Sequence, residues 1–398
     1  MEKQKCPELR FKKYINNWIA EQVKDVISNR SAKYNPALEQ SDFPCIELEH
    51  LSQVTGEILG TVSSLKQKSI KNKFDSNNIL FGKLRPYLKK FANPNFAGVC
   101  SSEIWVLSSE KQTNDFLFQF VQSNQFLNLV NIQTGSKMPR ADWKYLDSEV
   151  INYPEKSEQI QIAKLLKELD QSITLKERKF AQTQNIKKAF LEKIFPKIGA
   201  KQPKIRLKGF TGDWQIEAIG DVLEEVFRPI SLDNETKYRL VTVKRRNGGI
   251  AERAILKGKD ILVKSQFEVK AGEYIISKRQ VVHGATGLVP PELDGSVVSN
   301  EYLVGQGTDK LNIEFFALLS TLPEMYKKFF LSSYGVDIEK LFFDVNDWKK
   351  REILLPSLEE QVQISAFFKQ VDETLKLQKQ QLQTLKNLKQ AFLEKMFV

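Results

Sequence analysis

The feature that most constrains this 398-residue chain is an internal repeat that closes each of its halves. Residues 154–196 align without a gap on residues 356–398, at a constant offset of 202, with sixteen identities among forty-three positions. The block Ala-Phe-Leu-Glu-Lys ends both copies, at 189–193 and at 391–395. A repeat of this kind means that one structural unit is built twice, so any fold must contain two equivalent halves.

A weaker repeat, at an offset of 196, opens each half. It consists of Pro7, Arg10, Lys12, Trp18, Asp25 and Val26, matched by Pro203, Arg206, Lys208, Trp214, Asp221 and Val222. The interiors correspond only loosely: Gly98–Glu103 resembles Gly295–Glu301, and Asp142-Trp143-Lys144 resembles Asp347-Trp348-Lys349. The two units therefore share their ends and differ in their middles.

The repeated segment has the 3.5-residue apolar period of a coiled-coil seam. Seven of ten seam positions are apolar in the first copy and eight of ten in the second: Ile162, Leu166, Leu169, Ile173, Phe180, Phe190 and Ile194, then Ile364, Phe368, Val371, Leu375, Leu382, Leu385, Phe392 and Met396. The fifth seam position is polar in both copies, Lys176 and Gln378, which predicts a device that sets the register. Each helix follows a proline, with Ser157 or Ser357 as its predicted N-cap, and spans roughly 55 Å at ~1.5 Å per residue.

The order is globule, helix, globule, helix, with segments 1–153, 154–202, 203–355 and 356–398. The globules read as mixed α/β, because short strand-like stretches alternate with Gly, Asn and Pro turns. Helices are predicted over Phe116–Val130 and Ile313–Phe330. The fold class is therefore α+β, with two mixed α/β domains separated by two long helices. Because the segment after the first helix resembles the start of the chain, the last helix should return to the first globule and pack antiparallel to the first helix, giving a pseudo-twofold coiled coil.

The charge favours a polyanionic partner. Sixty Lys and Arg against forty-nine Asp and Glu leave a net charge of +11, and such a surplus gains free energy by releasing the counterions of phosphates. A need for solubility is the alternative explanation. The sequence shows no signal peptide and no apolar run near the ~20 residues that cross a bilayer, so we expect a cytoplasmic protein.

Few residues suggest catalysis. The three cysteines have unrelated spacings and the two histidines, His50 and His283, lie in different halves, so no metal site is predicted. The sequence has no phosphate-binding Gly-x-x-x-x-Gly-Lys-Ser/Thr motif and no Asn/Asp-Pro-Pro-aromatic motif of an amino-methyltransferase. We therefore predict a non-catalytic chain, with no catalytic residue and no cofactor of its own.

Basic and amide side chains next to glycine form the candidate DNA-contacting clusters. Lys serves as a point charge for phosphate, whereas Arg, Asn and Gln make bidentate contacts with base edges. A solvated surface is the alternative explanation for each cluster taken singly, but clusters occur in corresponding places of both halves. The candidate residues are Lys83, Arg85, Lys89, Lys90, Ser136, Lys137 and Arg140 in the first half, and Lys244, Arg245, Arg246, Asn247, Lys278, Arg279 and Gln280 in the second.

The duplicated order, with Pro-x-x-x-Glu-Gln opening each helix and Ala-Phe-Leu-Glu-Lys closing it, resembles the specificity subunit of type I restriction-modification systems. The resemblance covers essentially the whole chain. It departs at Tyr334-Gly335-Val336, where the first domain has Thr134-Gly135-Ser136. Loop contacts therefore do not transfer simply from one half to the other.

The resemblance implies that segments 1–153 and 203–355 are target-recognition domains, each reading one half of a bipartite double-stranded DNA site. It also implies that the paired helices set the spacer between the half-sites and that two methyltransferase (modification) subunits dock on the chain. Those partners would bring S-adenosylmethionine, and motor-nuclease (restriction) subunits would bring ATP and Mg²⁺.

The pairs Glu192-Lys193 and Glu394-Lys395 lie off the helix seam yet match between the copies, so we predict that they bind the modification subunit twice. Simple solvated helix charges are the alternative. Two other classes of protein stay open for the whole chain: a non-catalytic coiled-coil adaptor without a DNA role, and the recognition part of a fused restriction-methylation enzyme.

Overall fold

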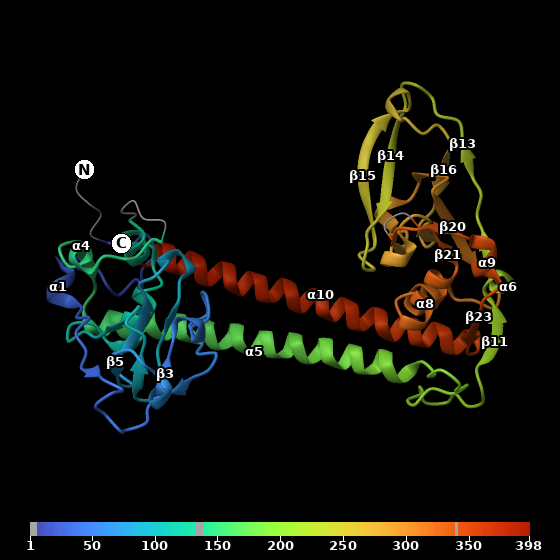
Figure 1. Ribbon diagram of the computed structural model, residues 1–398. Helices are drawn as coiled ribbons and strands as arrows, with labels where there is room; N and C mark the ends of the chain where they lie inside the picture. Colours follow the sequence, from blue (N-terminus) through green and yellow to red (C-terminus); the bar gives the residue numbers. More distant parts are fainter. Residues whose placement is uncertain (1–5, 133–137, 339–340) are drawn as a thin grey trace. The chain divides into compact units, whose positions relative to one another are not determined.

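The computed structural model describes residues 6–132, 138–338 and 341–398. Its contacts divide the chain into two compact units (Figure 1). Unit 1 comprises Met1–Phe180 with Gln378–Val398, and unit 2 comprises Ala181–Leu377. Each unit therefore combines one globule with the first part of one long helix and the last part of the other.

The two long helices are α5 (Lys156–Ile194) and α10 (Leu358–Lys395). The predicted N-cap is confirmed for α10, because the Ser357 hydroxyl accepts the Glu360 N–H at 3.3 Å. It is wrong for α5. Because α5 begins at Lys156, Ser157 lies inside the helix and cannot cap it. Its hydroxyl donates to the Glu155 carboxylate at 2.7 Å.

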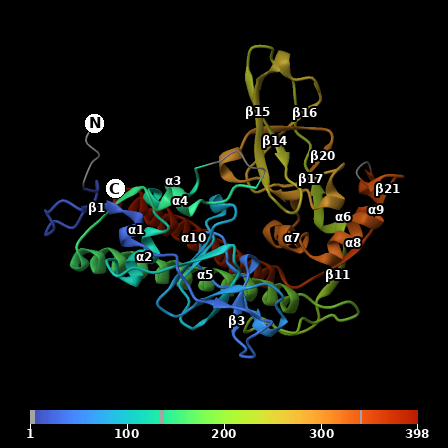
Figure 2. The same cartoon turned by 60° about the vertical axis from the view of Figure 1, so that its left-hand side comes forward.

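Within each unit the segments of α5 and α10 pack side by side and antiparallel, as expected (Figures 1 and 2). In unit 1, Lys389 pairs with Asp170 at 2.6 Å, and Lys386 pairs with Glu177 at 2.7 Å. In unit 2, Lys187 pairs with Asp372 at 2.5 Å.

Lys187 and Lys389 occupy equivalent seam positions of the two helices. Asp170 and Asp372 are also equivalent, and each lies next to a seam position. The same ion pair is therefore formed once in each unit. The predicted polar seam position also makes a contact, because Lys176 donates to Gln381 at 2.7 Å. A charge left without its partner at the seam is costly, so these contacts favour one register.

Unit 1 is built from short strands and a few short helices. They are β1 (Ile19–Gln22), α1 (Val23–Val26), β2 (Lys33–Tyr34), β3 (Pro44–Ile46), β4 (Val62–Ser63), β5 (Lys71–Phe74), β6 (Ile79–Gly82), β7 (Phe91–Ala92), β8 (Gly98–Cys100), β9 (Ile104–Leu107), α2 (Asn114–Phe120), α3 (Asn124–Val130), α4 (Trp143–Leu146) and β10 (Val150–Tyr153). One sheet has the order β2-β5-β8-β3-β4, with β3 and β8 parallel. A second has the order β7-β6-β9, and β1 pairs with β10.

Unit 2 repeats this plan with longer strands. They and its helices are β11 (Gln215–Ala218), α6 (Ile219–Val222), β12 (Leu223–Glu225), β13 (Pro229–Ile230), β14 (Lys237–Val243), β15 (Ile250–Lys257), β16 (Gln266–Val269), β17 (Tyr274–Ser277), β18 (Thr286–Leu288), β19 (Ser296–Ser299), β20 (Tyr302–Gly307), α7 (Ile313–Leu319), α8 (Pro323–Leu331), β21 (Ser333–Tyr334), β22 (Phe342–Phe343), α9 (Val345–Lys349) and β23 (Glu352–Leu355). Its sheets have the orders β13-β16-β19-β14-β15 and β12-β20-β17-β18, with β14 and β19 parallel. The interiors therefore share a topology that their sequences hardly show.

Two sequence predictions need correction. Each predicted interior helix is two helices. In unit 1 the break lies at Ser123, which caps α3, and in unit 2 it lies before Pro323, which begins α8. Both residues favour a new helix start over continuation.

The proposed match of Asp142-Trp143-Lys144 with Asp347-Trp348-Lys349 is also wrong. Asp142 caps α4 and Asp344 caps α9, so these two aspartates are equivalent. Trp348 then takes the place of Leu146, and both side chains are fully buried.

The end of each long helix is buried in the globule of the unit that it enters. In unit 1, Phe397 packs against Trp18 and Phe116, with ring centroids 6.3 and 5.5 Å apart. In unit 2, Phe195 packs against Trp214 and Phe315 at 6.0 and 5.6 Å. The shared tryptophan near the start of each half therefore packs against the repeated helix end. Large buried aromatics of this kind dominate core energetics.

A buried ion pair holds the opening segment of each globule to the start of its helix. Arg10 binds both carboxylate oxygens of Glu158 at 2.7 Å in unit 1. Arg206 binds Glu360 at 2.9 and 2.7 Å in unit 2. Both glutamates are almost completely buried, and Glu158 raises the pKa of Arg10 through their hydrogen bond.

The glutamine that follows each of these glutamates ties the helix to its globule. Gln159 accepts the Thr113 N–H at 2.8 Å and donates to the Pro154 carbonyl at 2.9 Å. Gln361 makes the same contacts with the Asn312 N–H, at 2.9 Å, and the Pro356 carbonyl, at 3.0 Å. The motif Pro-x-x-x-Glu-Gln is thus a structural clamp, formed once in each unit.

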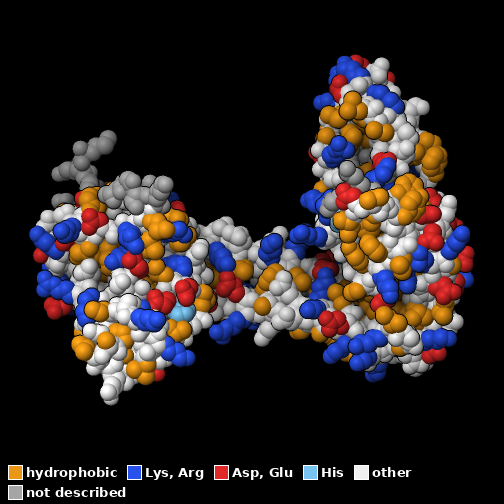
Figure 3. Space-filling view, viewed as in Figure 1, with side chains coloured by type: hydrophobic (Ala, Val, Ile, Leu, Met, Phe, Trp, Pro, Cys, Tyr) orange, Lys and Arg blue, Asp and Glu red, His pale blue; other side chains and the backbone are white. Residues whose placement is uncertain are grey.

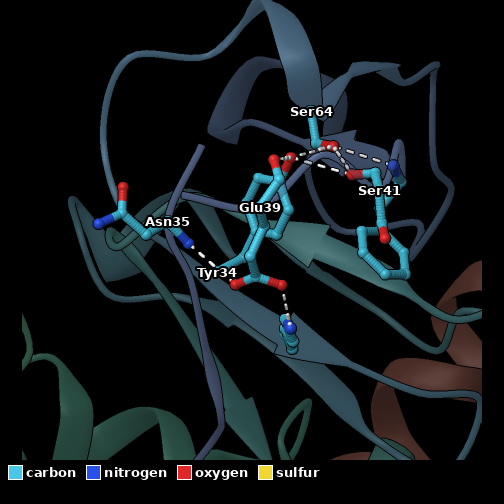
Figure 4. A network of polar contacts seen from close by, with 7 residues as sticks. Tyr34, Asn35, Glu39, Ser41 and Ser64 are labelled. Atoms are coloured by element: carbon cyan, nitrogen blue, oxygen red, sulfur yellow. Dashed lines mark hydrogen bonds and ion pairs between the residues drawn. The ribbon is translucent and has the colours of Figure 1, made fainter. Parts of the chain in front are cut away.

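A polar network joins β2 to the segment that follows β4, and so connects the two outer strands of the larger sheet of unit 1 (Figure 4). Buried Tyr34 accepts a hydrogen bond from Ser64 at 3.1 Å and donates to the Ser41 carbonyl at 3.0 Å. Glu39 accepts from Lys73 at 2.6 Å, and this contact lowers the pKa of the Glu39 carboxyl. The network ties residues 35–43 to β2, to β5 and to Ser64 after β4.

Among the described residues, no helix has the length and apolar character that crossing a membrane requires.

Removing one partner of the buried Arg10–Glu158 ion pair should destabilise unit 1. Arg10→Ala leaves the Glu158 carboxylate buried without a cation, and this situation costs about 3–5 kcal/mol. The control Glu177→Ala breaks the more exposed pair with Lys386 and should cost about 1 kcal/mol or less. Chemical denaturation followed by fluorescence measures both. Equal losses of unfolding free energy in the two variants would contradict this role of the Arg10–Glu158 pair.

Candidate nucleic-acid interface

In unit 1, backbone pairing joins two basic segments that lie far apart in the sequence. Leu84 and Arg140 form an isolated antiparallel bridge. The Arg85 N–H donates to the Pro139 carbonyl at 2.8 Å, and the Ala141 N–H donates to the Lys83 carbonyl at 2.8 Å. This pairing brings the segments of Lys83, Arg85 and Arg140 together, which their separate positions in the sequence did not predict.

The neighbouring lysines extend this surface unequally. Lys89 accepts the Val54 N–H at 2.9 Å through its carbonyl, so its backbone joins the loop that connects β3 and β4. Lys90, by contrast, directs its ammonium onto the Leu48 carbonyl at 2.5 Å. Ser136 and Lys137 lie outside the described residues.

In unit 2 the counterpart of that loop is the tight turn that closes the β14–β15 hairpin, which Figures 1 and 2 show as two long neighbouring strands. The Lys244 N–H donates to the Gly249 carbonyl at 2.8 Å, and the Gly248 N–H donates to the Arg245 carbonyl at 3.2 Å. The two central residues, Arg246 and Asn247, have φ angles of 58° and 54°. Two consecutive positive φ angles are the signature of a type I′ turn.

This turn is tied to the second basic segment of unit 2. The N–H groups of Arg246 and Asn247 donate to the carbonyls of His283 and Gly284, at 2.7 and 2.9 Å. Gly284 has a φ of 71°, and a Cβ there would lie 3.1 Å from the Asn247 side-chain oxygen. The close approach of the two loops therefore needs glycine.

The second segment follows β17 and contains Lys278, Arg279 and Gln280. The Lys278 ammonium binds the Asn300 carbonyl at 3.0 Å, and Arg279 binds the Glu301 carboxylate at 2.8 Å. The side-chain oxygen of Gln280 is buried and accepts no hydrogen bond from the described residues. Of the predicted residues in unit 2, Lys244, Arg245, Arg246, Asn247 and Arg279 have exposed side chains.

Both units place a glutamate at the same point of this surface. The N–H of the lysine after β6 or β17 donates to the carbonyl of Glu103 or Glu301, at 2.9 Å in each case. Each glutamate also holds an arginine, Arg140 in unit 1 (3.0 Å) and Arg279 in unit 2 (2.8 Å). These arginines come from different parts of the two units, so the pair was not visible in the sequence alignment.

Figure 3 shows Lys and Arg side chains interleaved with Asp and Glu on the visible face of each unit. On this face charges of both signs are therefore mixed, and the composition of each loop decides where positive charge is dense. The turn at residues 244–249 is a dense basic site, because its six residues include three cations and no acid. The matching connection in unit 1, residues 47–61, contains Glu47, Glu49 and Glu57.

The described residues contain no group of three or more His, Cys, Asp or Glu side chains placed to hold a metal ion. Burial raises the pKa of the Cys45 thiol to about 11, and it raises the pKa of Cys100 further. A thiol of this kind is a poor nucleophile. His50 has a structural role, because its Nδ1 accepts the Glu47 N–H at 3.0 Å.

The predicted partner-binding residues Glu192, Lys193, Glu394 and Lys395 are all exposed. The backbone gives the repeated lysines a further, structural role, since the carbonyls of Lys193 and Lys395 accept the N–H groups of Ile205 and Leu9 at 3.0 and 2.9 Å. These bonds satisfy carbonyls that a helix end would otherwise leave without a donor.

A second duplicated feature of the long helices escaped the sequence prediction. Each unit exposes three apolar helix side chains at equivalent positions, each between 39% and 59% exposed. They are Ile160, Leu175 and Leu388 in unit 1, and Val362, Leu377 and Ile186 in unit 2. A single exposed leucine is ordinary, and what distinguishes this set is that the same three positions are exposed in both copies.

Comparison with known proteins identifies the family. Residues 17–185 and 211–387 match the model of the type I restriction modification DNA specificity domain. The chain belongs to this family. The two matches cover most of the chain, one for each globule with part of the long helix that follows it.

Individual relatives are more distant. The Type I restriction enzyme EcoDI specificity subunit of Escherichia coli is 26% identical over 187 residues, which are 45% of this chain and 42% of that relative. The S subunit of a type I restriction-modification system from M. genitalium has a similar fold, with a TM-score of 0.60, 13% identity and 99% of each chain covered. The HsdS subunit from Thermoanaerobacter tengcongensis gives a TM-score of 0.50, 19% identity and 96% coverage of each chain.

The contact between the two loops of unit 2 can be tested without DNA. Gly284→Ala should loosen the turn, because its methyl group would crowd Asn247, and hydrogen exchange of the Arg246 and Asn247 amides should accelerate. Gly272→Ala is a matched control, since Gly272 also has a positive φ (85°) but its Cβ would meet nothing within 4 Å. Unchanged protection in Gly284→Ala, or equal loss in both variants, would contradict the contact.

Proposed function

We propose that this chain is the DNA-recognition subunit of a type I restriction-modification complex and that each unit reads one half of a bipartite site. Two specificity-domain matches in one chain carry the proposal. The structure supports it with two equivalent surfaces. Their shared frame consists of the helix starts, the helix ends and the sheet order, whereas their loops differ. Shared frames suit a common partner, whereas different loops suit different base sequences.

The turn of unit 2 is the first place at which to test DNA binding. Lys244→Ala/Arg245→Ala/Arg246→Ala should weaken binding and flatten the dependence of log K on log salt. Each phosphate contact contributes about 0.9 to that slope, so two such contacts, by Lys244 and Arg245, account for a loss of up to about 1.8. Titrations of duplex DNA at several salt concentrations measure it.

The matched control is Lys237→Ala/Lys257→Ala/Lys259→Ala, which removes three charges at the opposite end of the same β14–β15 hairpin. Its slope should stay within one unit of the wild type. A slope unchanged in the turn variant would remove this turn from the interface. A wild-type chain that bound no DNA in a salt-dependent manner would favour the adaptor function.

The long helices are proposed to dock two modification subunits. The exposed apolar trio is present once in each unit and suits two copies of one partner, because an interface needs an apolar centre that charged residues alone do not supply. The exposed pairs Glu192-Lys193 and Glu394-Lys395 would then lie at its rim. Because α5 and α10 each contribute to both units, their length is also proposed to set the spacing of the half-sites.

Docking should fail one copy at a time. Leu175→Glu should leave one bound modification subunit, Leu377→Glu should also leave one, and the double variant should leave none, as measured by native mass spectrometry. Gln184→Glu adds the same charge at an exposed polar position of α5 and should leave two. If the double variant kept two copies, while charge reversal at the Glu-Lys pairs reduced them, the charged pairs would be the docking residues.

In this account the chain itself supplies recognition and no chemistry. S-adenosylmethionine is assigned to the modification subunits, and ATP with Mg²⁺ to restriction subunits. The complex would then act on DNA in the cytoplasm. The fused-enzyme alternative receives no support from the two family matches, which are both to specificity domains.

A further inference from the structure

Backbone strain is concentrated at the proposed DNA surface. Among the described residues, the non-glycine residues with positive φ are Val54, Arg85, Lys89, Arg246 and Asn247. All five lie in the loops that pair across the candidate interface of their unit. The left-handed region costs free energy for any residue with a Cβ, and strained residues of this kind tend to gather where function requires a fixed geometry.

Two of the five are arginines with exposed side chains, one in each unit. Arg85 has a φ of 52° and donates its N–H to the Pro139 carbonyl at 2.8 Å. Arg246 has a φ of 58° and donates its N–H to the His283 carbonyl at 2.7 Å. Each is thus held by the neighbouring loop of the same surface while its guanidinium faces solvent.

The sequence of the turn in unit 2 also offers a less strained register. A type I′ turn favours Asn-Gly at its two central positions, and this chain has that pair at Asn247-Gly248. The turn is nevertheless centred one residue earlier, on Arg246 and Asn247. The hydrogen bonds from the Arg246 and Asn247 N–H groups to the carbonyls of His283 and Gly284 favour this more strained register. As a result, an arginine is held in a fixed position at the tip of the hairpin.

We propose that Arg85 and Arg246 are the guanine-reading residues of the two units, each making a bidentate contact with O6 and N7 of one guanine in the major groove. This proposal rests on the proposed DNA-recognition function. Arginine has the planar fork that such a contact needs, whereas a phosphate contact needs only a flexible charge. A fixed backbone reduces the conformational freedom lost on binding and so favours specificity.

Two other arginines of the two surfaces serve as a contrast. Arg140 binds both oxygens of Glu103, at 3.0 and 3.3 Å, and Arg279 binds Glu301 at 2.8 Å. Their guanidinium groups are already engaged by carboxylates at equivalent positions of the two units. We therefore assign them to the support of the loops.

The test is selection of preferred sites from a random duplex pool by the chain in complex with its modification subunits. Arg246→Lys keeps the charge but loses the fork. It should therefore reduce the preference for guanine at one position by about tenfold or more, in one half-site only, without changing the salt slope. Arg85→Lys should do the same in the other half-site. The matched controls Arg140→Lys and Arg279→Lys should leave every preference unchanged.

A folding control accompanies these variants. Arg246→Asn places a residue that tolerates positive φ at the strained position, so its thermal midpoint should not fall while the guanine preference is lost. The proposal is overturned if the Lys variants keep every guanine preference, if the controls lose as much, or if the selected half-sites contain no guanine. A wild-type complex that selected no sequence at all would instead defeat the proposed function.

Discussion

The structure depends on the burial of each long helix's end in the globule of the unit that it enters. Phe397 fills the site formed by Trp18 and Phe116, and Phe195 fills the site formed by Trp214 and Phe315. Truncating a buried aromatic of this kind typically costs about 3–5 kcal/mol. Unit 1 is therefore completed by the opposite end of the chain, whereas unit 2 is completed by the helix end that directly precedes its globule. The buried pairs Arg10–Glu158 and Arg206–Glu360 then hold the start of each globule to the start of its own helix.

This arrangement separates what must be constant from what can vary. The helix start, the helix end and the glutamine clamp repeat contact for contact in the two units. The loops above them are free to differ. Unit 1 connects β3 to β4 with a long acidic segment, whereas unit 2 connects β14 to β15 with a short basic turn, yet both pair with the loop that follows β6 or β17. A shared frame with exchangeable loops is a physical basis for reading two different sequences with one fold.

The repeat, the helix seam and the return of the last helix to the first globule could be predicted from sequence, since they depend on periodicity and on copies of one segment. The common topology of the interiors could not, because strands of two to eight residues in divergent sequences leave little periodic signal. Likewise, sequence spacing identified Lys244–Asn247 and Lys278–Gln280 as basic clusters, but only backbone pairing joins them. Nor could it distinguish Arg246, held in a strained turn, from Arg279, bound to Glu301.

We propose that the two units read DNA independently on a shared frame. The most direct measurement exchanges residues 203–355 for the equivalent segment of another member of the family and maps the sites preferred by the assembled complex. The account predicts that one half-site changes completely while the other half-site stays as in the wild type. A change in both half-sites, or in neither, would contradict it.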